Sequence, residues 1–245
     1  MKRFEVAAIV GFLLSLVVPP EALAEFQLAL YTGKSFTLKS DLEIHQPSKE
    51  TNLTFGDVSF NDKSFSPPYY YGFKAGYFPE AIPFLGFEFD FFHFKIFSEV
   101  DRTVRLRGIR QGVAIDTRQQ LREIVKAFNI SHGVNYFALN IVGRLRLLQD
   151  ANLFPHGRIQ PYIGVGGGPV ILHPEVNIEN EKQEQYELGA GIQTFAGVKV
   201  FFFKHVGLFT EYKFTHSNFT VNLRRGEGET TLNTHHAMAG IVFQF

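Results

Sequence analysis

Apolar and polar residues alternate through eight segments of the chain, which turn-rich or charged stretches separate. A period of two residues is typical of β-strands, whereas an amphipathic helix repeats every 3.6 residues. In residues 84–97, for example, Phe87 and Phe89 lie on one face, and Glu88 and Asp90 lie on the other. The eight segments are residues 25–38, 68–78, 84–97, 133–148, 159–172, 186–202, 206–221 and 231–245. The pattern predicts an all-β protein of eight antiparallel strands.

The links between these segments alternate between short and long. Short links lie at residues 79–83, 149–158 and 203–205, while the other four are longer, and the longest spans residues 98–132. Short turns at one rim and long loops at the other are typical of an up-and-down transmembrane β-barrel. We therefore expect short periplasmic turns and longer extracellular loops.

The polar faces are predicted to point into this barrel. Bulky aromatic faces would overfill an eight-stranded interior, and a Lys or Arg that faces lipid costs about 2–4 kcal/mol. Charges inside are tolerated when they are paired. The predicted lumen network consists of Lys74, Glu88, Asp90, Arg144, Arg146, Lys199, Glu211 and Lys213. We expect Glu88 and Asp90 to pair with Arg144 and Arg146 and to plug the lumen, with Arg146 the strongest candidate for a place at the wet rim.

The first 24 residues resemble a secretory signal peptide. Lys2 and Arg3 precede an apolar run over residues 6–18, and Ala22-Leu23-Ala24 fits a small-x-small cleavage site. An uncleaved anchor is the alternative, but the run is shorter than the ~20 residues of a membrane span. We expect cleavage after Ala24, which gives a signal peptide at residues 1–24 and a barrel domain at residues 25–245.

Composition supports strands and excludes several kinds of site. The chain has 28 Phe, 9 Tyr and 22 Gly, a combination that favours strands, tight turns and interfacial aromatics. With no Cys, it has no disulfide, thiolate zinc site or Cys nucleophile. Its formal net charge of zero gives no general attraction to nucleic acid.

The end of the chain carries the most specific motif. Ala237, Ala239, Ile241, Phe243 and Phe245 alternate up to the terminal residue. This strand, with residues 207–215 and 232–235 before it, resembles the closing hairpin of the OmpA-like, opacity-type outer-membrane β-barrel domain family. The resemblance implies a Gram-negative outer membrane, contact with its lipid and lipopolysaccharide, and a C-terminal signal at Ile241, Phe243 and Phe245 for the barrel-assembly machinery.

Members of that family are structural barrels, adhesins, lipid-facing modulators or narrow, porin-like pores, so the resemblance implies location rather than activity. We expect a structural or surface-interaction role, with a narrow channel for small solutes as the alternative. A lipopolysaccharide-modifying lipid hydrolase is a weaker alternative. Such a hydrolase needs its nucleophile and its base on the same face of the barrel. The only close candidate pair in this chain is His216-Ser217, and adjacent strand residues point to opposite faces. We therefore predict no catalytic site and no enzyme.

Other candidate chemistry is weaker still. His216, His235 and His236 lack a carboxylate ligand at a convincing spacing, so no metal site is predicted. The glycine-rich run at residues 164–168 precedes Pro169 rather than a helix, which argues against a phosphate cradle. We expect no cofactor.

The long loop between residues 98 and 132 is predominantly basic. Arg102, Arg105, Arg107 and Arg110 could contact the phosphates of lipopolysaccharide. Residues 116–128 have the spacing of a short amphipathic helix. The acidic stretch at residues 175–187 could instead pair with this loop, and a solvated loop without a ligand is an equal alternative.

Overall fold

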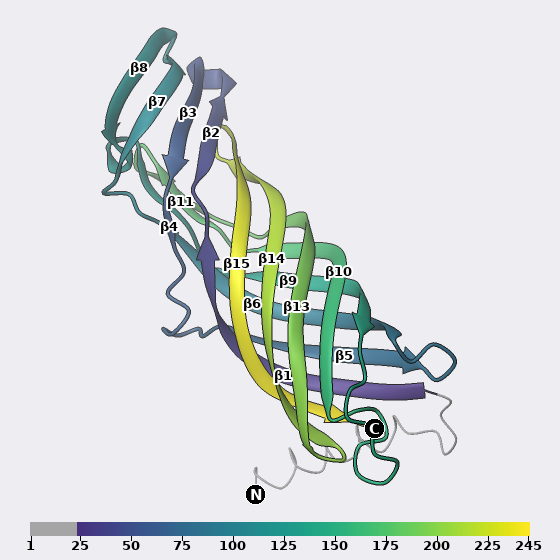
Figure 1. The fold of residues 1–245 in the computed structure, drawn as a ribbon. Helices are drawn as coiled ribbons and strands as arrows, with labels where there is room; N and C mark the ends of the chain where they lie inside the picture. Colours follow the sequence, from purple (N-terminus) through teal and green to yellow (C-terminus); the bar gives the residue numbers. More distant parts are fainter. Residues whose placement is uncertain (1–23) are drawn as a thin grey trace, which may run out of the picture.

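Eight strands of the computed structural model, which describes residues 24–245, close into one antiparallel ring (Figure 1). Around the ring they are β1 (Ala24–Thr37), β5 (Tyr71–Pro79), β6 (Leu85–Ser98), β9 (Val125–Arg144), β10 (Ile159–Leu172), β13 (Glu187–Phe203), β14 (Val206–Leu223) and β15 (Gly226–Gln244). β15 pairs with β1 from Gln244 opposite Gln27 to Thr234 opposite Thr37. The predicted eight-stranded up-and-down barrel is therefore confirmed. The predicted signal peptide lies outside the described residues, except for Ala24.

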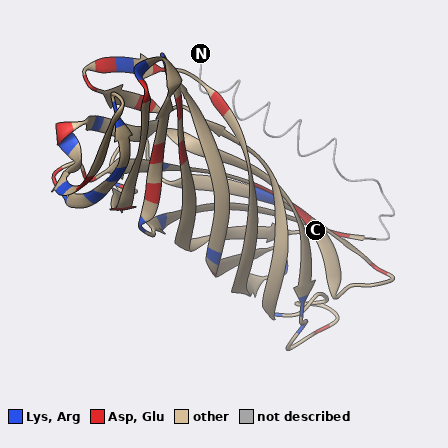
Figure 2. Cartoon of the chain, turned by 90° about the horizontal axis from the view of Figure 1, so that it is seen from above, with Lys and Arg blue, Asp and Glu red and all other residues tan. Residues whose placement is uncertain are grey.

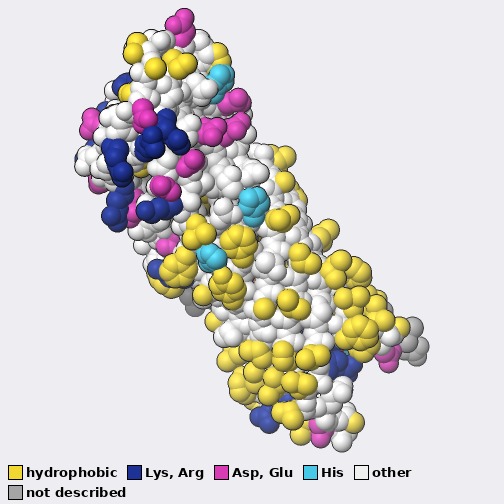
Figure 3. Space-filling view, turned by 45° about the horizontal axis from the view of Figure 1, so that its top comes forward, with side chains coloured by type: hydrophobic (Ala, Val, Ile, Leu, Met, Phe, Trp, Pro, Cys, Tyr) yellow, Lys and Arg dark blue, Asp and Glu magenta, His cyan; other side chains and the backbone are white. Residues whose placement is uncertain are grey.

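The barrel is inverted relative to a water-soluble one. Apolar side chains cover the outside of its strands, as Figure 3 shows. Leu139 is 72% exposed and Ile163 is 63% exposed, whereas Asn140, the neighbour of Leu139, is only 2% exposed. The outward set includes Leu30, Phe73, Phe87, Leu139, Ile141, Ile163, Val165, Ile192, Leu208, Tyr212 and Ile241. The predicted choice of faces is thus the observed one.

The interior also contains large aromatic rings, whereas the sequence argument expected glycines and charged residues to fill the lumen. The buried aromatic residues include Tyr31, Tyr70, Phe92, Phe94, Tyr136, Tyr162, Phe195 and Phe209. They fit because glycines lie beneath them. A Cβ on Gly72 would lie 2.3 Å from the ring of Tyr31, and a Cβ on Gly164 would lie 2.3 Å from the ring of Phe195. Only glycine allows such a close approach, so the lumen is filled by rings over glycines as well as by ions.

Beyond one end of the barrel the sheet continues into a second structure. Strands β2 (Ser40–Gln46), β3 (Thr51–Val58), β7 (Thr103–Arg110) and β8 (Val113–Gln120) extend the sheet from β15, while the hairpin of β11 (Glu175–Ile178) and β12 (Glu181–Glu184) pairs with β9. The 3₁₀ turns Pro47–Lys49 and Leu121–Glu123 and the short strand β4 (Phe60–Asn61), which pairs with β6, complete the elements. We call β2, β3, β7, β8, β11 and β12 the cap.

The cap has its own apolar core, and many of the charged residues of the chain lie on its strands and turns (Figure 2). Members of the core include Leu42, Ile44, Leu53, Phe55, Val58, Val104, Leu106, Leu121, Ile124, Val125, Phe128, Val176 and Ile178. Three long links of the sequence prediction thus contribute strands. The fourth, between β14 and β15, is only a two-residue turn between Leu223 and Gly226, because both strands continue into the cap.

The predicted amphipathic helix at residues 116–128 is wrong. These residues form the end of β8, a 3₁₀ turn at Leu121–Glu123 and the beginning of β9. Leu121, Ile124, Val125 and Phe128 have helical spacing, but the turn and strand bury all four of them in the cap core. Tertiary packing has overridden the local pattern. Among residues 24–245, no helix is long and apolar enough to cross a membrane.

Candidate functional site: the lumen and the cap

The centre of the lumen contains a cluster of five ionisable side chains. Lys74 Nζ lies 2.9 Å from Glu88 Oε1 and 2.5 Å from Glu211 Oε2. Lys213 pairs with Asp90, and each of the five side chains is at most 4% exposed. Lys74 and Asp90 are cross-strand neighbours on β5 and β6, while Glu211 and Lys213 reach the cluster from β14 on the other side of the lumen. Such a cluster is tolerable only because nearly every charge has a partner.

Neutral groups add further contacts to this cluster. The hydroxyl of Tyr31 donates to Asp90 at 2.5 Å, and the amide of Gln193 donates to the same carboxylate at 3.2 Å. Lys74 Nζ lies 4.3 Å from the ring centre of Phe195, a distance typical of a cation–π contact. The cluster is therefore held by contacts on several sides in the middle of the barrel interior.

A second cluster lies toward the short-turn end. Arg144 donates to both carboxylate oxygens of Glu25 at 2.5 Å, and its guanidinium lies 3.7 Å from the ring centre of Phe78. Lys199 donates to Gln27, which shares the inner face of β1 with Glu25. Glu25 was missed among the predicted site residues, although its alternation with Gln27 places both on one face of the first segment.

The pairing predicted between β6 and β9 is wrong. Arg144 pairs with Glu25 on β1 rather than with Glu88 or Asp90, whose partners are the two lysines of the central cluster. Arg146 follows the end of β9, and its guanidinium donates to the main-chain carbonyl of Pro155 at 2.6 Å. Of the eight predicted lumen residues, seven lie buried inside the barrel and Arg146 lies at the rim.

The hydrolase candidates do not form a catalytic arrangement. Ser217 is 2% exposed, faces the interior and accepts a hydrogen bond from the hydroxyl of Tyr136 at 2.8 Å. His216 faces the opposite side of β14, where its Nδ1 lies 2.8 Å from the side-chain oxygen of Asn233. The imidazole of His216 and the hydroxyl of Ser217 therefore lie on opposite faces of β14. The hydroxyl of Ser217 is not accessible from the lipid-facing side of the barrel.

The other two histidines considered for a metal lie on different faces of β15. His236 is fully buried in the lumen, where its Nδ1 lies 3.2 Å from the hydroxyl of Tyr70. His235 forms a hydrogen bond with the exposed hydroxyl of Tyr212. These residues and His216 do not converge on a common point.

The four arginines proposed for phosphate contact lie on β7 or next to it. Each of three has an acidic partner: Arg102 with Glu99 at 3.1 Å, Arg105 with Asp116 at 2.9 Å and Arg110 with Glu179 at 2.9 Å. The acidic link at residues 175–187 thus pairs with the basic one through Arg110. Within the described chain, Arg107 is the member of this set without an acidic partner within 4.0 Å.

The C-terminal residues complete the ring. Phe245 exchanges two main-chain hydrogen bonds with Phe26 at 2.9 and 3.1 Å. Ile241 and Phe245 are each 45% exposed on the outer face, and Phe243 between them is partly exposed on the same side. The motif that carries the family resemblance is therefore the outer, apolar edge of the closing strand.

No family model matches the chain, and no curated protein matches it in sequence. Several solved structures have a similar fold. Neisserial surface protein A is 11% identical, with a TM-score of 0.43 and coverage of 91% of this chain and 98% of that one. OprG from Pseudomonas aeruginosa is 10% identical, with a TM-score of 0.46 and coverage of 92% of this chain and 97% of that one. The outer-membrane protease OmpT from Escherichia coli is 7% identical, with a TM-score of 0.42 and coverage of 91% of this chain and 96% of that one. At such values no activity is transferred, and the fold assignment rests on the closed ring itself.

Proposed function

We propose that this chain is an outer-membrane β-barrel of a Gram-negative bacterium that anchors an exposed cap at the cell surface. The inversion of burial along its strands carries the proposal. Leu139 and Ile141 are 72% and 52% exposed, whereas Asn140 between them is buried. Such strands are stable where acyl chains rather than water surround them. The cap, which is apolar inside and charged outside, suits the aqueous phase beyond the membrane.

Cell fractionation with heat-modifiable gel migration tests this location. We expect the chain in the outer-membrane fraction, with faster migration before boiling than after it, because a folded barrel resists detergent. A compact, water-soluble monomer purified without detergent would overturn the proposal. Ile241, Phe243 and Phe245 are proposed to be the signal read by the barrel-assembly machinery, so removal of Phe245 is expected to slow assembly in cells.

We further propose that the lumen is closed. Two paired clusters and the rings of Tyr31, Phe92 and Phe195 occupy the barrel interior, which supports a structural barrel rather than a channel. Planar bilayers with the purified protein are expected to show no steady current. A stable current that changes on Arg144→Glu would instead support the narrow channel. Incubation with purified lipopolysaccharide is expected to release no acyl chain, since Ser217 faces the lumen.

The outward face of the β7–β8 hairpin is proposed to contact phosphate groups of lipopolysaccharide. Arg105 and Arg118 lie directly opposite each other across the two strands, and Arg107 and Asp116 form the next pair. Like charges opposite each other destabilise a strand pair unless a counter-charge is present. With three arginines against one aspartate, this face favours a bound anion, and lipid phosphate is the anion at that surface.

Hydrogen exchange in vesicles tests the contact. Phosphorylated lipopolysaccharide is expected to slow exchange over Thr103–Gln120, and the effect is expected to disappear with the dephosphorylated lipid and in Arg107→Ala/Arg118→Ala. The variant Arg102→Ala/Arg122→Ala removes the same charge from residues already paired with Glu99 and Asp101, so it is the matched control. Equal protection in the two double variants would show that this face makes no specific contact.

A further inference from the structure

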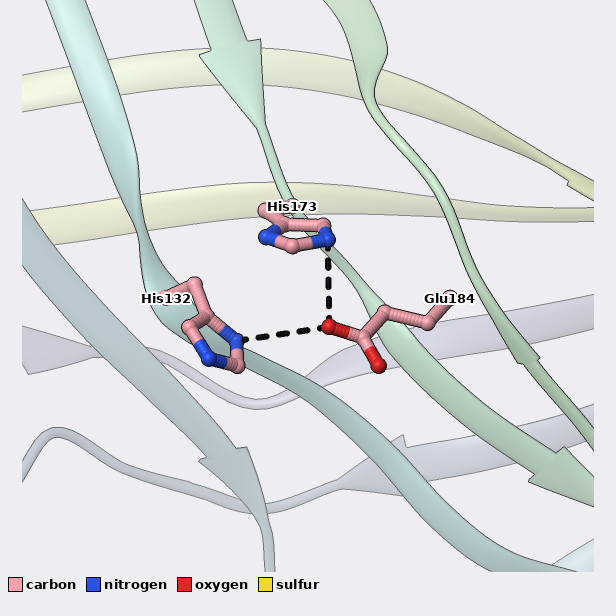
Figure 4. A group of neighbouring side chains, drawn as sticks. All are labelled: His132, His173 and Glu184. Carbon is pink, nitrogen blue, oxygen red and sulfur yellow. Dashed lines mark ion pairs between the residues drawn. The ribbon is translucent and has the colours of Figure 1, made fainter.

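Two histidines and a glutamate converge at the junction of the barrel and the cap (Figure 4). His132 lies on β9, His173 between β10 and β11, and Glu184 at the end of β12. His173 Nε2 lies 3.2 Å from Glu184 Oε1, and His132 Nδ1 lies 3.9 Å from the same oxygen. One donor atom from each residue lies within 4.8 Å of the other two.

Irregular backbone places both imidazoles there. Pairing of β9 with β6 is interrupted between Val134 and Ile130, so residues 131–133 bulge opposite Lys95. Gly133 adopts a φ of +114°, which suits glycine. Bulges commonly redirect a side chain next to functional sites.

His173 occupies the matching gap on the neighbouring strands. β10 ends at Leu172, opposite Val134, and β11 begins at Glu175, opposite Asn129. His173 therefore lies beside the bulge of β9 that holds His132. The ring of Tyr186 stacks on that of His173 at 4.3 Å with an interplanar angle of 14° and limits its rotation.

We propose that His132, His173 and Glu184 bind a divalent transition-metal ion, Zn²⁺ in the first place. Two imidazoles and a carboxylate form a donor set typical of zinc, whereas Ca²⁺ and Mg²⁺ prefer oxygen ligands alone. In a tetrahedral site with bonds of about 2.1 Å, donor atoms lie about 3.4 Å apart. The distances of 3.2 and 3.9 Å are close to this spacing, and all three donor atoms lie within 4.8 Å of one another, so side-chain rotations would bring them to it.

Glu175 lies next to this group and would supply a fourth donor. Its Oε1 lies 3.5 Å from His132 Nδ1. Two neutral imidazoles with two carboxylates balance the charge of a divalent ion. All four side chains retain solvent access, with His173 the most buried at 17%, so the ion can enter without opening the barrel.

A bound ion would add a second attachment of the β11–β12 hairpin to the barrel, beside the pairing of β11 with β9. Two of its ligands, Glu175 and Glu184, are the first and last residues of that hairpin, whereas His132 belongs to β9. Occupancy would therefore fix the part of the cap that also holds Glu179, the partner of Arg110. The site is independent of the proposed phosphate contact on the β7–β8 face.

Isothermal titration of the untagged chain in detergent with ZnCl₂ tests the proposal. We expect saturable binding of one ion. The affinity should fall at least about tenfold in His132→Ala and in His173→Ala, because loss of an outer-shell partner alone already weakens metal binding by that factor. Glu184→Gln is expected to weaken binding too. His45→Ala removes an exposed cap histidine outside the cluster and should leave the affinity unchanged. Unsaturable binding, or wild-type affinity in His132→Ala/His173→Ala, would overturn the site.

Hydrogen exchange gives a second readout, with Zn²⁺ again as the probe. The ion is expected to slow exchange of the Glu175–Glu184 amides in the wild type but not in the double histidine variant. Co²⁺ should give the visible absorption of a tetrahedral site in the wild type alone. Equal protection in both proteins would mean that the ion binds elsewhere. Heat-modifiable migration checks that the barrel of each variant is folded, and metal-free hydrogen exchange over β2, β3 and β7 checks the cap. Glu184→Gln provides a test that leaves both histidines in place.

Discussion

The barrel and the cap are built from one continuous sheet, yet they bury opposite kinds of side chain. In the barrel, Lys74 and Asp90 are buried, while Leu139 faces outward. In the cap, Leu42 and Ile44 are buried, while Glu43 between them is exposed. The two-residue period is the same in both regions and identifies only the strand. The chemistry of the outward residues identifies the surrounding medium, which is lipid for one region and water for the other.

The two regions also use charge differently. Ion pairs in the lumen are almost fully buried, so the loss of one partner leaves an uncompensated buried charge. The pair of Arg105 with Asp116 on the cap is more than half exposed, and solvent screening leaves it only a small contribution to stability. The largest effects of substitution should therefore come from the lumen and the smallest from the outer face of the cap.

The strongest test of this contrast is Asp90→Ala. It deprives Lys213 of its closest partner and Tyr31 of its acceptor, and we expect a loss of about 3–5 kcal/mol in the free energy of unfolding. Urea unfolding in lipid vesicles measures this loss. The variant Asp90→Leu/Lys213→Met removes both charges and should recover most of the stability. A single variant as stable as the wild type would mean that the central cluster is not structural.

Phe55→Ala separates the two apolar cores. Phe55 is fully buried in the cap, and loss of its ring is expected to cost about 3–5 kcal/mol of local stability. Hydrogen exchange should accelerate over β2, β3 and β7, while heat-modifiable migration of the barrel stays unchanged. Phe65→Ala is the control, since that ring is 69% exposed. If the barrel melts together with the cap, the two regions form one cooperative unit.

A matched pair of arginine substitutions compares the two media directly. Leu139 on the barrel is 72% exposed, and Val113 on the cap is 68% exposed. Leu139→Arg is expected to destabilise the protein by about 2–4 kcal/mol in vesicles, because the charge faces lipid. Val113→Arg should change stability by no more than about 0.5 kcal/mol, because it faces water. Equal costs in vesicle unfolding experiments would contradict the assignment of the two media.

The barrel could be predicted from the sequence because each ring strand carries its own signal. The segment predicted at residues 159–172, between the links at residues 149–158 and 173–185, has the same bounds as the observed strand β10. The side of the sheet that each charge faces follows from the same period. Interior aromatic residues such as Phe195 were not predicted, since their place depends on a glycine of the neighbouring strand, here Gly164.

The alternation of apolar and polar residues could not predict the ion pairs across the lumen. It also did not reveal the strands of the cap. Glu25 and Arg144 are 119 residues apart in sequence and lie on strands that are not neighbours, so no local pattern joins them. The cap strands are short, although Leu42 with Ile44, and Leu53 with Phe55, carry a recognisable alternation. His132 and His173 come together through a bulge and a break in the sheet, which depend on strand register.

The mildest test titrates one cap carboxylate. Burial would raise the pKa of Glu179, but hydrogen bonds from Arg110 and Lys49 outweigh it and hold that pKa below the ordinary value of 4.5. A lowered folded pKa contributes stability above pH 4.5, and this contribution is lost as the pH falls through the folded value. Hydrogen exchange of the β11–β12 hairpin should therefore accelerate below pH 4.5 relative to the barrel strands. In Glu179→Gln the hairpin should already exchange faster at neutral pH, and this part of the acid response should disappear. An unchanged acid response in the variant would assign it to other carboxylates, and Arg110 would then contribute little to holding the hairpin.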